Sequence, residues 1–557
     1  MKRNAMTCIS LLLILCFLIA GCQTASTTTS SASITSISTT TQAKTVERTL
    51  LTIAAPANVL IEDYSTNAFT KVLEESLSVK LKVDVWSEPT TKLSLLVGSN
   101  AELPDIINFA LDDTTIFKYG SSGIFLPLNK YYANKDLAKK FTALEKNKQD
   151  FILDNTRYAD GNVYSMSLLG EYFPNNVPYN LLINKTWLNK LGKEIPKTTK
   201  EFYDVLKAFL ENDMNGNGAK DEIPMLGCTN GAGSNVSAVL LNSFVNANPD
   251  KNYFYVESSK IQAAFISDDF RTGLSYIRSL VKDKLLDSAS FTQTKDQFKA
   301  IVNQNMALVG VLNIIDHDNA FNKPTDAKTG YIAMYDHPIG SQYVYMKTPA
   351  GPNGKSYTIY KPTVPSQLYF ITKSCKTPEL AFQLGDLGYD PYNSKISRHG
   401  TEGKNWTRDP EVLKKYKAAT IDGVTQPVEW VLLDDPWSRA QNEHWMQRFP
   451  GYFPFSFNLT RGQTIDAKTS KMEVVYDMFK NSVPDEYIGN LKYSTKEIDE
   501  LSLIKTAIDD YVKESITAFA TGNKDVDKDW DRYISELNNM GLKRYIQITQ
   551  DAYDRTK

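Results

Sequence analysis

Alternating apolar and polar stretches near the start of the chain predict strands and helices in a regular order. Residues 50–54 form a short apolar run typical of a buried strand, and residues 81–85 alternate between apolar and polar positions as a half-buried strand does. Residues 67–75, between them, carry apolar side chains at helical spacing, and residues 106–109 form another short apolar run. This order predicts a parallel sheet covered by helices, an α/β fold.

Further along the chain, helix-start signals accompany apolar stripes. Ser267 precedes apolar residues that recur every three or four positions, and Thr294 with Gln297 forms a capping-box pattern in front of a second stripe. Thr377 is followed by a proline and a glutamate, which suit the first turn of a helix. Residues 495–553 are largely helical by the same criterion, so we expect a helical C-terminal part.

The N-terminus is organised like a signal peptide. Lys2 and Arg3 precede an apolar stretch over residues 8–20, which is shorter than the ~20 residues that a membrane-spanning helix needs. Small residues and then Cys22 follow, an arrangement that resembles the lipobox of bacterial lipoproteins. The resemblance implies cleavage after residue 21 and attachment of a diacylglyceryl group to the Cys22 thiol, a stable two-chain anchor. The alternative is an ordinary secretory signal in which Cys22 stands by chance.

Residues 22–47 consist almost entirely of serine, threonine and other small or polar residues. Such a segment has too little apolar surface to offset the entropy lost on ordering, so we expect a flexible tether. An O-glycosylated stalk would serve the same mechanical purpose. The signal peptide (1–21) and the tether (22–47) together predict an extracellular body held on the outer face of the cell membrane through Cys22.

Composition and charge exclude several classes of protein. Hydrophobic residues make up 42% and aromatic residues 11% of the 557 positions, which is enough for large cores and excludes a disordered chain. The net charge of −2 argues against a general nucleic-acid binder, and apart from the N-terminal stretch no apolar run is long enough to cross a membrane. Beyond Cys22 the chain holds only Cys228 and Cys375, which we expect to be buried free thiols, although a disulfide between them stays open.

A loop behind the helical stretch 199–209 has the spacing of a calcium-binding loop. Alternate residues from Asp213 onwards match the pattern D-x-[DN]-x-[DN]-G, in which Gly218 permits the sharp turn. Calcium prefers about six to eight oxygen ligands, and side chains two apart in a tight loop can all point inward. The predicted ligands are Asp213, Asn215, Asn217, the Ala219 carbonyl, Asp221 and Glu222.

The end of this loop departs from an EF-hand. Pro224 stands at the twelfth position, where an EF-hand has a bidentate glutamate, so Glu222 at the tenth position must complete the coordination. We expect one structural Ca²⁺ that cross-links the loop and takes no part in catalysis. The alternative is a solvated Asn-Gly turn without a metal.

Several short motifs occur in a fixed order along the chain. They are AELPDI at 101–106, GIFLPL at 123–128, INKTWLNKLG at 183–192, IPKTTKEF at 195–202, HGTEGKNW at 399–406 and YIQITQDAYDR at 545–555. Together they resemble extracellular solute-binding proteins of family 1. The resemblance is to the large oligosaccharide-binding branch, which is similar to lipoproteins of Gram-positive ABC importers and to periplasmic alginate-binding proteins. The alginate-binding branch has a loop with Asp-Glu at positions 9 and 10, where this chain has Asp221 and Glu222.

This resemblance implies a two-lobed, type II periplasmic-binding-protein-like fold. Each lobe is expected to hold a mainly parallel sheet flanked by helices, with hinge strands between the lobes. We assign residues 48–175 and 345–400 to the first lobe, and residues 176–344 and 401–557, with the calcium loop, to the second. The resemblance also implies that the ligand is trapped between the lobes by hinge closure and that the chain catalyses no reaction.

The expected function is capture of a carbohydrate, foremost an oligosaccharide, for an ABC importer. The expected partners are the saccharide, the permease subunits and the membrane through the lipid anchor, with no nucleic acid, and we expect a monomer. A secreted carbohydrate-active enzyme and a saccharide-sensing lipoprotein remain alternatives. The catalytic patterns G-x-S-x-G, H-E-x-x-H and G-x-x-x-x-G-K-[ST] are absent from the sequence.

Two stretches carry candidate ligand-binding residues. Asp112 and Asp113 follow the predicted strand 106–109, and in open α/β sheets ligands bind beyond the carboxyl ends of strands. Residues 430–448 are rich in tryptophan, whose ring can stack on the apolar face of a sugar. The candidates there are Trp430, Trp437 and Trp445. The alternatives are a helix cap for the aspartates and core packing for the tryptophans.

Overall fold

The structure is a computed structural model that describes residues 48–322, 337–434, 439–464 and 471–557. The chain divides into two units, residues 1–47 and residues 48–557, and the description below concerns the second unit. The predicted signal peptide (1–21), the tether (22–47) and the lipidation site Cys22 lie outside the described residues.

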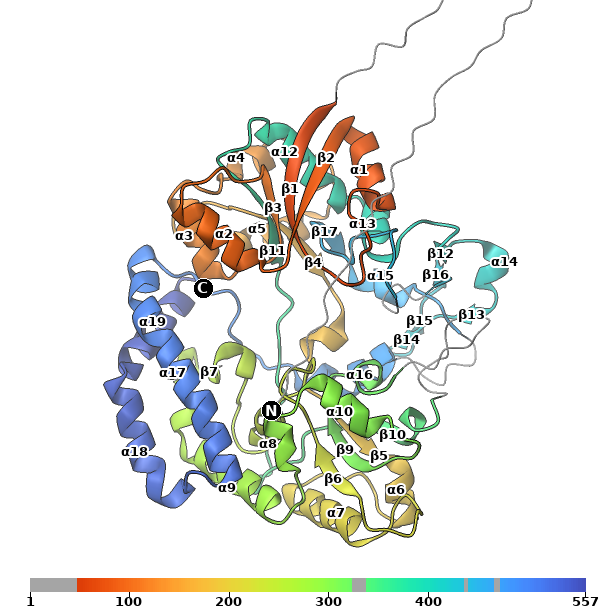
Figure 1. The fold of residues 1–557 in the computed structure, drawn as a ribbon, viewed down its shortest axis with the longest axis vertical. Coiled ribbons are helices and arrows are strands. Elements are labelled where there is room, and N and C mark those ends of the chain that lie inside the picture. Colours follow the sequence, from red (N-terminus) through yellow and green to blue (C-terminus); the bar gives the residue numbers. More distant parts are fainter. Residues whose placement is uncertain (1–47, 323–336, 435–438, 465–470) are drawn as a thin grey trace, which may run out of the picture. The chain divides into compact units, whose positions relative to one another are not determined.

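The first lobe is built on a six-stranded sheet in the order β17-β4-β11-β3-β1-β2 (Figure 1). Its strands are β1 (Thr49–Pro56), β2 (Val79–Trp86), β3 (Ile106–Asn108), β4 (Met166–Gly170), β11 (Ser366–Ile371) and β17 (Gly451–Phe453). All run in the same direction except β11, which is antiparallel to both of its neighbours. The strands predicted at 50–54, 81–85 and 106–109 are therefore confirmed, as is a mainly parallel sheet.

Both faces of this sheet are covered, because successive strand residues point to opposite sides. Ile53 belongs to the core on one face and its neighbour Ala54 to the core on the other face. The covering helices are α1 (Ala68–Leu77), α2 (Pro89–Gly98), α3 (Asp113–Ser121), α4 (Asn129–Ala133), α5 (Lys146–Thr156), α12 (Pro378–Asp386) and α13 (Pro391–His399). The predicted helix at 67–75 is α1, with Asn67 as its N-cap.

The second lobe holds a four-stranded sheet in the order β10-β5-β9-β6. Its strands are β5 (Leu181–Asn184), β6 (Ile223–Leu226), β9 (Val309–Asn313) and β10 (Tyr343–Met346). β5 alone is antiparallel to its neighbours, so the other three strands share one direction. The helices around it are α6 (Lys185–Lys190), α7 (Thr199–Glu211), α8 (Val236–Leu241), α9 (Asp268–Lys282), α10 (Lys295–Val302), α17 (Thr495–Thr521), α18 (Val526–Asn539) and α19 (Leu542–Asp554).

The C-terminal helices α17, α18 and α19 share one hydrophobic core with the second sheet. Figure 1 shows α17 and α19 beside β7 (Phe254–Glu257) and α9. The predicted helical C-terminal part is therefore confirmed. In the described residues, no helix is both long and apolar enough to cross a membrane.

Extended segments join the two sheets and hydrogen-bond to each other. A short 3-10 helix, Phe173–Asn176, follows β4, and Asn176 Nδ2 donates to the Lys361 carbonyl at 2.9 Å and to Thr363 Oγ1 at 2.8 Å. The Lys361 N–H donates back to the Asn176 carbonyl at 2.7 Å. Two chain crossings therefore run side by side between the two sheets, where the two-lobed prediction expects hinge strands.

Apart from β17, the described part of the region between α13 and α17 is made of short elements. They are β12 (Trp406–Thr407), α14 (Pro410–Leu413), β13 (Tyr416–Lys417), β14 (Thr420–Ile421), β15 (Val424–Thr425), β16 (Val431–Leu432), α15 (Phe455–Leu459), β18 (Gln463–Thr464) and α16 (Lys471–Phe479). Elsewhere, β8 (Lys260–Ala263) forms a hairpin with β7, and α11 (His317–Ala320) follows β9.

The predicted assignment of all of 401–557 to the second lobe does not fit one part of the structure. β17 pairs in parallel with β4 in the first sheet, and Trp445 and Phe449 pack in the core of the first lobe. The physical reason is burial: these large rings contact Phe69 of α1, with ring centroids 5.8 and 5.4 Å away.

The helix-start signals agree with the structure in two of three cases. Ser267 caps α9 through its side chain, and Thr294 and Gln297 form the reciprocal capping box of α10. Helix α12 begins at Pro378 as predicted, but the Thr377 side chain makes no capping hydrogen bond.

Candidate functional site

The carboxyl ends of the five parallel strands of the first sheet lie at one edge. In open α/β sheets, ligands bind beyond this edge. Asp112 and Asp113 follow β3, and Pro454 follows β17. Gln367 lies at the same edge because β11 is antiparallel and begins there. The sheet topology therefore brings together side chains that are far apart in the sequence.

Asp112 is the N-cap of α3. Its carboxylate accepts a hydrogen bond from the Thr115 N–H at 2.9 Å, and the hydroxyls of Thr114 and Thr115 also donate to it. Burial opposes ionisation, but these hydrogen bonds outweigh burial and lower the pKa of Asp112. Asp112 therefore acts as a helix cap, which was the alternative to a ligand-binding role.

Asp113 belongs to a polar cluster of residues from three segments. The Tyr158 hydroxyl donates to its carboxylate at 3.3 Å and Gln367 Nε2 donates at 3.0 Å, while Gln367 Nε2 also lies 3.0 Å from the Tyr158 hydroxyl oxygen. The Tyr158 ring stacks on Phe117 with centroids 5.3 Å apart. Each member of the cluster is therefore held in place before any ligand arrives.

A charge of opposite sign faces this cluster from the second lobe. Burial raises the pKa of Asp113, and the Lys251 ammonium lowers it in part. Burial likewise lowers the pKa of Lys251, and Asp113 opposes that change. Lys251 Nζ donates to the Gly489 carbonyl at 3.0 Å. Asp113 and Lys251 are thus close enough to influence each other's pKa, and both can hydrogen-bond to hydroxyls.

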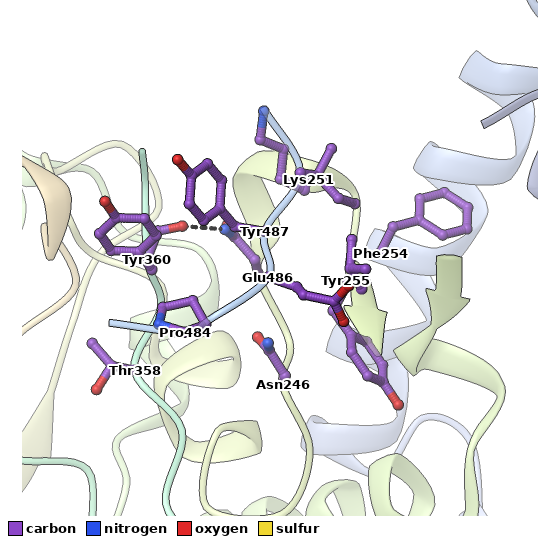
Figure 2. A pocket seen from close by; sticks show the side chains of 12 residues that line it. Asn246, Lys251, Phe254, Tyr255, Thr358, Tyr360, Pro484, Glu486 and Tyr487 are labelled. Carbon is purple, nitrogen blue, oxygen red and sulfur yellow. Dashed lines mark hydrogen bonds between the residues drawn. The ribbon is translucent and has the colours of Figure 1, made fainter. Parts of the chain in front are cut away.

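Lys251 also lines a small pocket in the second lobe, shown in Figure 2. Tyr360 and Tyr487 lie on one side of it, with ring centroids 5.4 Å apart, and Tyr255 lies on the other. Asn248 Nδ2 donates to the Tyr360 carbonyl at 2.9 Å. Its cavity volume of about 20 Å³ leaves room for roughly one water molecule, so it is too small for a sugar ring.

A larger cavity lies beyond the carboxyl end of β17. Its volume is about 200 Å³. Its walls include Lys395 of α13, Glu429, Trp430, Tyr452, Phe457 and Thr460. We call it the β17 cavity. It lies at the sheet edge where topology favours ligand binding, and the aromatic residues Trp430, Tyr452 and Phe457 form part of its wall.

Trp430 packs in the protein interior and also borders a cavity, so it agrees in part with both roles considered for it, core packing and ligand binding. Its ring packs against Phe457, with centroids 4.7 Å apart, and against His399 at 5.0 Å, and the residue is fully buried. It also forms part of the wall of the β17 cavity. Lys395 and Phe457 could not be predicted from the sequence, because only long-range folding brings them beside Trp430.

Trp445 does not fit the prediction of a ligand-facing ring. It is fully buried, and its Nε1 donates to Thr70 Oγ1 at 2.9 Å. Tyr64 and Phe69 meet its ring edge-on, with centroids 5.2 and 5.8 Å away. Trp445 is therefore a core residue, which was the alternative considered for it. Trp437 lies outside the described residues.

The predicted calcium loop follows α7 and has a tightly hydrogen-bonded turn. Asp213 Oδ1 accepts from the Gly216 N–H at 2.6 Å, and Asp213 Oδ2 accepts from the Gly218 N–H at 2.8 Å. These backbone hydrogen bonds, with that from Gly218 the largest cause, lower the pKa of Asp213. Gly216 and Gly218 both have positive φ, which glycine adopts without strain.

Glu222 is the most unusual residue of this loop, because only 5% of its surface is exposed. Its Oε1 accepts from the Met214 N–H at 2.5 Å and from the Asn215 N–H at 3.1 Å. Its Oε2 is buried and has no hydrogen-bond partner in the described part of the chain. A buried carboxylate oxygen without a partner costs about 1–3 kcal/mol or more, and a divalent cation would satisfy it.

The other predicted oxygen ligands of the loop do not gather as closely around one point. Asp221 accepts hydrogen bonds from the side-chain amides of Asn215 at 3.0 Å and Asn217 at 3.0 Å. In the residues that the structure describes, no three aspartate, glutamate, histidine or cysteine side chains form a metal-binding group. The oxygen-only donor set and the unpartnered Glu222 oxygen nevertheless fit a hard cation such as Ca²⁺.

Cys228 and Cys375 are buried free thiols, as expected. Burial raises the pKa of Cys375 to about 12, so it carries no thiolate at neutral pH. A disulfide between the two is excluded in this structure.

Comparison with known proteins adds a family and a fold. Residues 60–391 match the sequence profile of bacterial extracellular solute-binding proteins. The chain is 23% identical over 537 residues to the fructooligosaccharide ABC transporter substrate-binding protein FusA of Streptococcus pneumoniae, covering 91% of this chain and 90% of FusA.

Solved structures show the same fold. FusA in complex with kestose aligns with a TM-score of 0.73 at 22% identity, covering 91% of this chain and 99% of FusA. A human-milk-oligosaccharide (HMO)-binding, ABC-transporter-associated solute-binding protein from Bifidobacterium longum infantis aligns with a TM-score of 0.73 at 19% identity, covering 91% and 99%. A FusA EF-hand mutant in complex with fructo-nystose aligns with a TM-score of 0.69 at 22% identity, covering 91% and 99%.

Proposed function

The chain belongs to the family of bacterial extracellular solute-binding proteins, and we propose that it captures an oligosaccharide for an ABC importer. The observation that carries this proposal is the likeness to FusA along nearly the whole chain, in sequence and in fold. The FusA structure holds kestose, and a second structural neighbour is named for binding human milk oligosaccharides. A carbohydrate is therefore the ligand class that we assign to this chain.

Capture would proceed by closure of the two lobes around the ligand. The hydrogen-bonded crossings at Asn176 and Lys361 would provide the hinge, and the influence of Lys251 on the pKa of Asp113 supports a ligand site near both residues. A saccharide that touches both lobes binds the closed form more tightly and so increases its population. The closed form then presents docking surfaces on both lobes to the permease subunits.

In the proposed function, the chain binds the saccharide and carries out no chemical step on it. A glycosidase needs two carboxyl groups about 5–10 Å apart, one of which stays free to donate or accept a proton. Asp112 is held as the cap of α3, and Asp113 is bonded to Tyr158 and Gln367. We therefore favour binding without cleavage over a secreted carbohydrate-active enzyme.

A thermal-shift screen with neutral oligosaccharides, kestose among them, tests the proposal. We expect at least one saccharide to raise the melting temperature in a concentration-dependent way, because a ligand that binds only the folded state stabilises it. Chromatography of the same mixtures after overnight incubation should recover that saccharide intact. Release of shorter saccharides would identify an enzyme and contradict the proposal.

The oxygen-rich loop would hold one structural Ca²⁺. Asp213, Asn215, Asn217, the Ala219 carbonyl, Asp221 and Glu222 would supply its ligands, and the ion would neutralise carboxylates that otherwise repel each other. The unpartnered Glu222 Oε2 and the EF-hand named for the FusA mutant support this assignment.

The body would be a monomer anchored to the outer face of the cell membrane. The lipobox-like sequence that ends at Cys22 and the Ser/Thr-rich segment behind it support a diacylglyceryl anchor and a tether. A tether of this kind would keep the binding lobes close to the permease.

A further inference from the structure

The β17 cavity permits a more specific statement about the ligand than its chemical class. We propose that it binds one ring of the captured saccharide and that Lys395 and Glu429 select a ring with neighbouring hydroxyl groups. This inference rests on the proposed carbohydrate-binding function. The cavity is formed by segments before and after β16. It includes Trp430, one of the predicted ligand-binding residues.

The aromatic residues of the wall give the cavity a fixed shape. Phe457 is half-buried and lies 4.7 Å from Trp430, with the two rings tilted by 41°. Tyr452, on another wall, is fixed because its hydroxyl donates to Glu171 Oε2 at 3.1 Å. Rigid aromatic walls lose little entropy when a ligand binds, so they are suited to hold one ring in a defined position.

Lys395 is positioned in the cavity by cation–π contacts. Its Nζ lies 4.8 Å from the ring centroid of Trp406, 5.0 Å from that of Trp430 and 5.5 Å from that of Phe457. Among the described residues it forms no hydrogen bond or ion pair, so its N–H groups are available to a ligand. Burial lowers its pKa, and the positive charge of Arg408 contributes. The ammonium is thus a partly desolvated donor in a fixed place.

Glu429 adds an acceptor to the cavity. The Glu429 N–H donates to the Thr460 carbonyl at 2.9 Å, which fixes the backbone, while its exposed carboxylate has no hydrogen bond or ion pair within the described part of the chain. Trp430 Nε1 is buried and likewise has no hydrogen-bond partner there. A sugar hydroxyl both donates and accepts, so two neighbouring hydroxyls can bond to Lys395 and Glu429 together.

The composition of the cavity argues against other ligand classes. An apolar ligand would leave the Lys395 ammonium without solvent or partner, which is costly. A cationic ligand would meet rings that already hold an ammonium, and an anionic ligand would meet the Glu429 carboxylate. A neutral, hydroxyl-rich ring is the class that satisfies the donors, the acceptor and the rings together.

Calorimetric titration of the purified chain with a panel of neutral oligosaccharides tests this assignment. The panel contains kestose and gluco-, galacto- and manno-oligosaccharides. The cavity variants are Lys395→Met, which keeps the apolar stem, and Glu429→Gln, which keeps the size. The matched control is Lys130→Met, because Lys130 also lies over an aromatic ring, 4.7 Å from the centroid of Tyr131, but lines neither cavity described above.

For the panel member that the wild type binds, we expect each cavity variant to raise Kd about tenfold or more and the control to change it less than about twofold. Without ligand, the melting temperatures of Glu429→Gln and Lys130→Met should agree with that of the wild type, since both side chains are exposed. Lys395→Met loses its cation–π contacts, so a cooperative unfolding transition is the evidence that this variant is folded. If the wild type binds a saccharide and both cavity variants bind it with the same Kd, the cavity assignment is wrong and the proposed function still stands. A wild type that binds no panel member overturns the proposed function, and the cavity assignment with it.

Discussion

At the residue scale, two buried histidines give the protein a definite response to acid. His399 and His444 each expose 1% of their surface. Burial lowers the pKa of His444 to about 4, and burial also lowers the pKa of His399 well below its usual value, with Arg398 adding to the effect. His444 Nδ1 accepts a hydrogen bond from the Met446 N–H at 3.2 Å, which requires an unprotonated nitrogen. Both imidazoles are therefore neutral in the folded protein.

Replacement of His444 should weaken the pH dependence of stability. Between the folded pKa of about 4 and the unfolded value of about 6.5, only the unfolded chain binds the proton, so stability falls with decreasing pH by up to about 3 kcal/mol from this residue. Urea unfolding of wild type and His444→Gln across this range measures the difference. We expect the difference in free energy of unfolding between wild type and His444→Gln to narrow as pH falls. A difference that stays constant would contradict a neutral, buried His444.

The tryptophans show what the sequence could and could not predict at this scale. Trp430 and Trp445 lie in one aromatic stretch, yet Trp445 is enclosed by Tyr64 and Phe69 from the other end of the chain. Trp430 instead borders a cavity with Lys395. Composition identified the stretch, but the role of each ring depends on contacts that only the folded chain brings together.

At the element scale, local signals were the most informative. Capping residues at Ser267 and Thr294 fixed helix starts because a cap depends on neighbours within one turn. β17 was not predicted, since a strand of three residues owes its position to pairing with β4 about 280 residues earlier. The same reason explains the misplaced part of the lobe boundary.

The segment from α7 through the oxygen-rich loop to β6 gives a prediction for calcium. Removal of calcium with a chelator should lower the melting temperature and added calcium should restore it, with about 3 kcal/mol gained when free calcium exceeds Kd a hundredfold. Glu222→Gln should abolish this response, because it removes the negative charge and one ligand oxygen from the buried carboxylate.

The control is Glu211→Gln, an exposed substitution at the end of α7 that leaves the loop ligands intact. Differential scanning calorimetry with chelator and with calcium compares the variants. If the wild type shows the same melting temperature in both conditions, the loop binds no structural calcium.

At the scale of the whole molecule, the proposed lipid anchor decides where the binding lobes work. In a Gram-positive host, the wild type should sediment with membranes and Cys22→Ser should appear in the medium, since the variant lacks the thiol that receives the lipid. Fractionation and metabolic labelling with a fatty acid measure this. Labelled Cys22→Ser protein that remains in the membrane would contradict the anchor.

In the proposed function, a saccharide is captured by closure of the two lobes and is released unaltered. Small-angle X-ray scattering of residues 48–557 tests it directly, without ligand and with the saccharide that raises the melting temperature. We predict a smaller radius of gyration with the saccharide bound, and recovery of that saccharide intact from the same sample. An unchanged radius at saturating saccharide, together with shortened saccharide products, would contradict the claim.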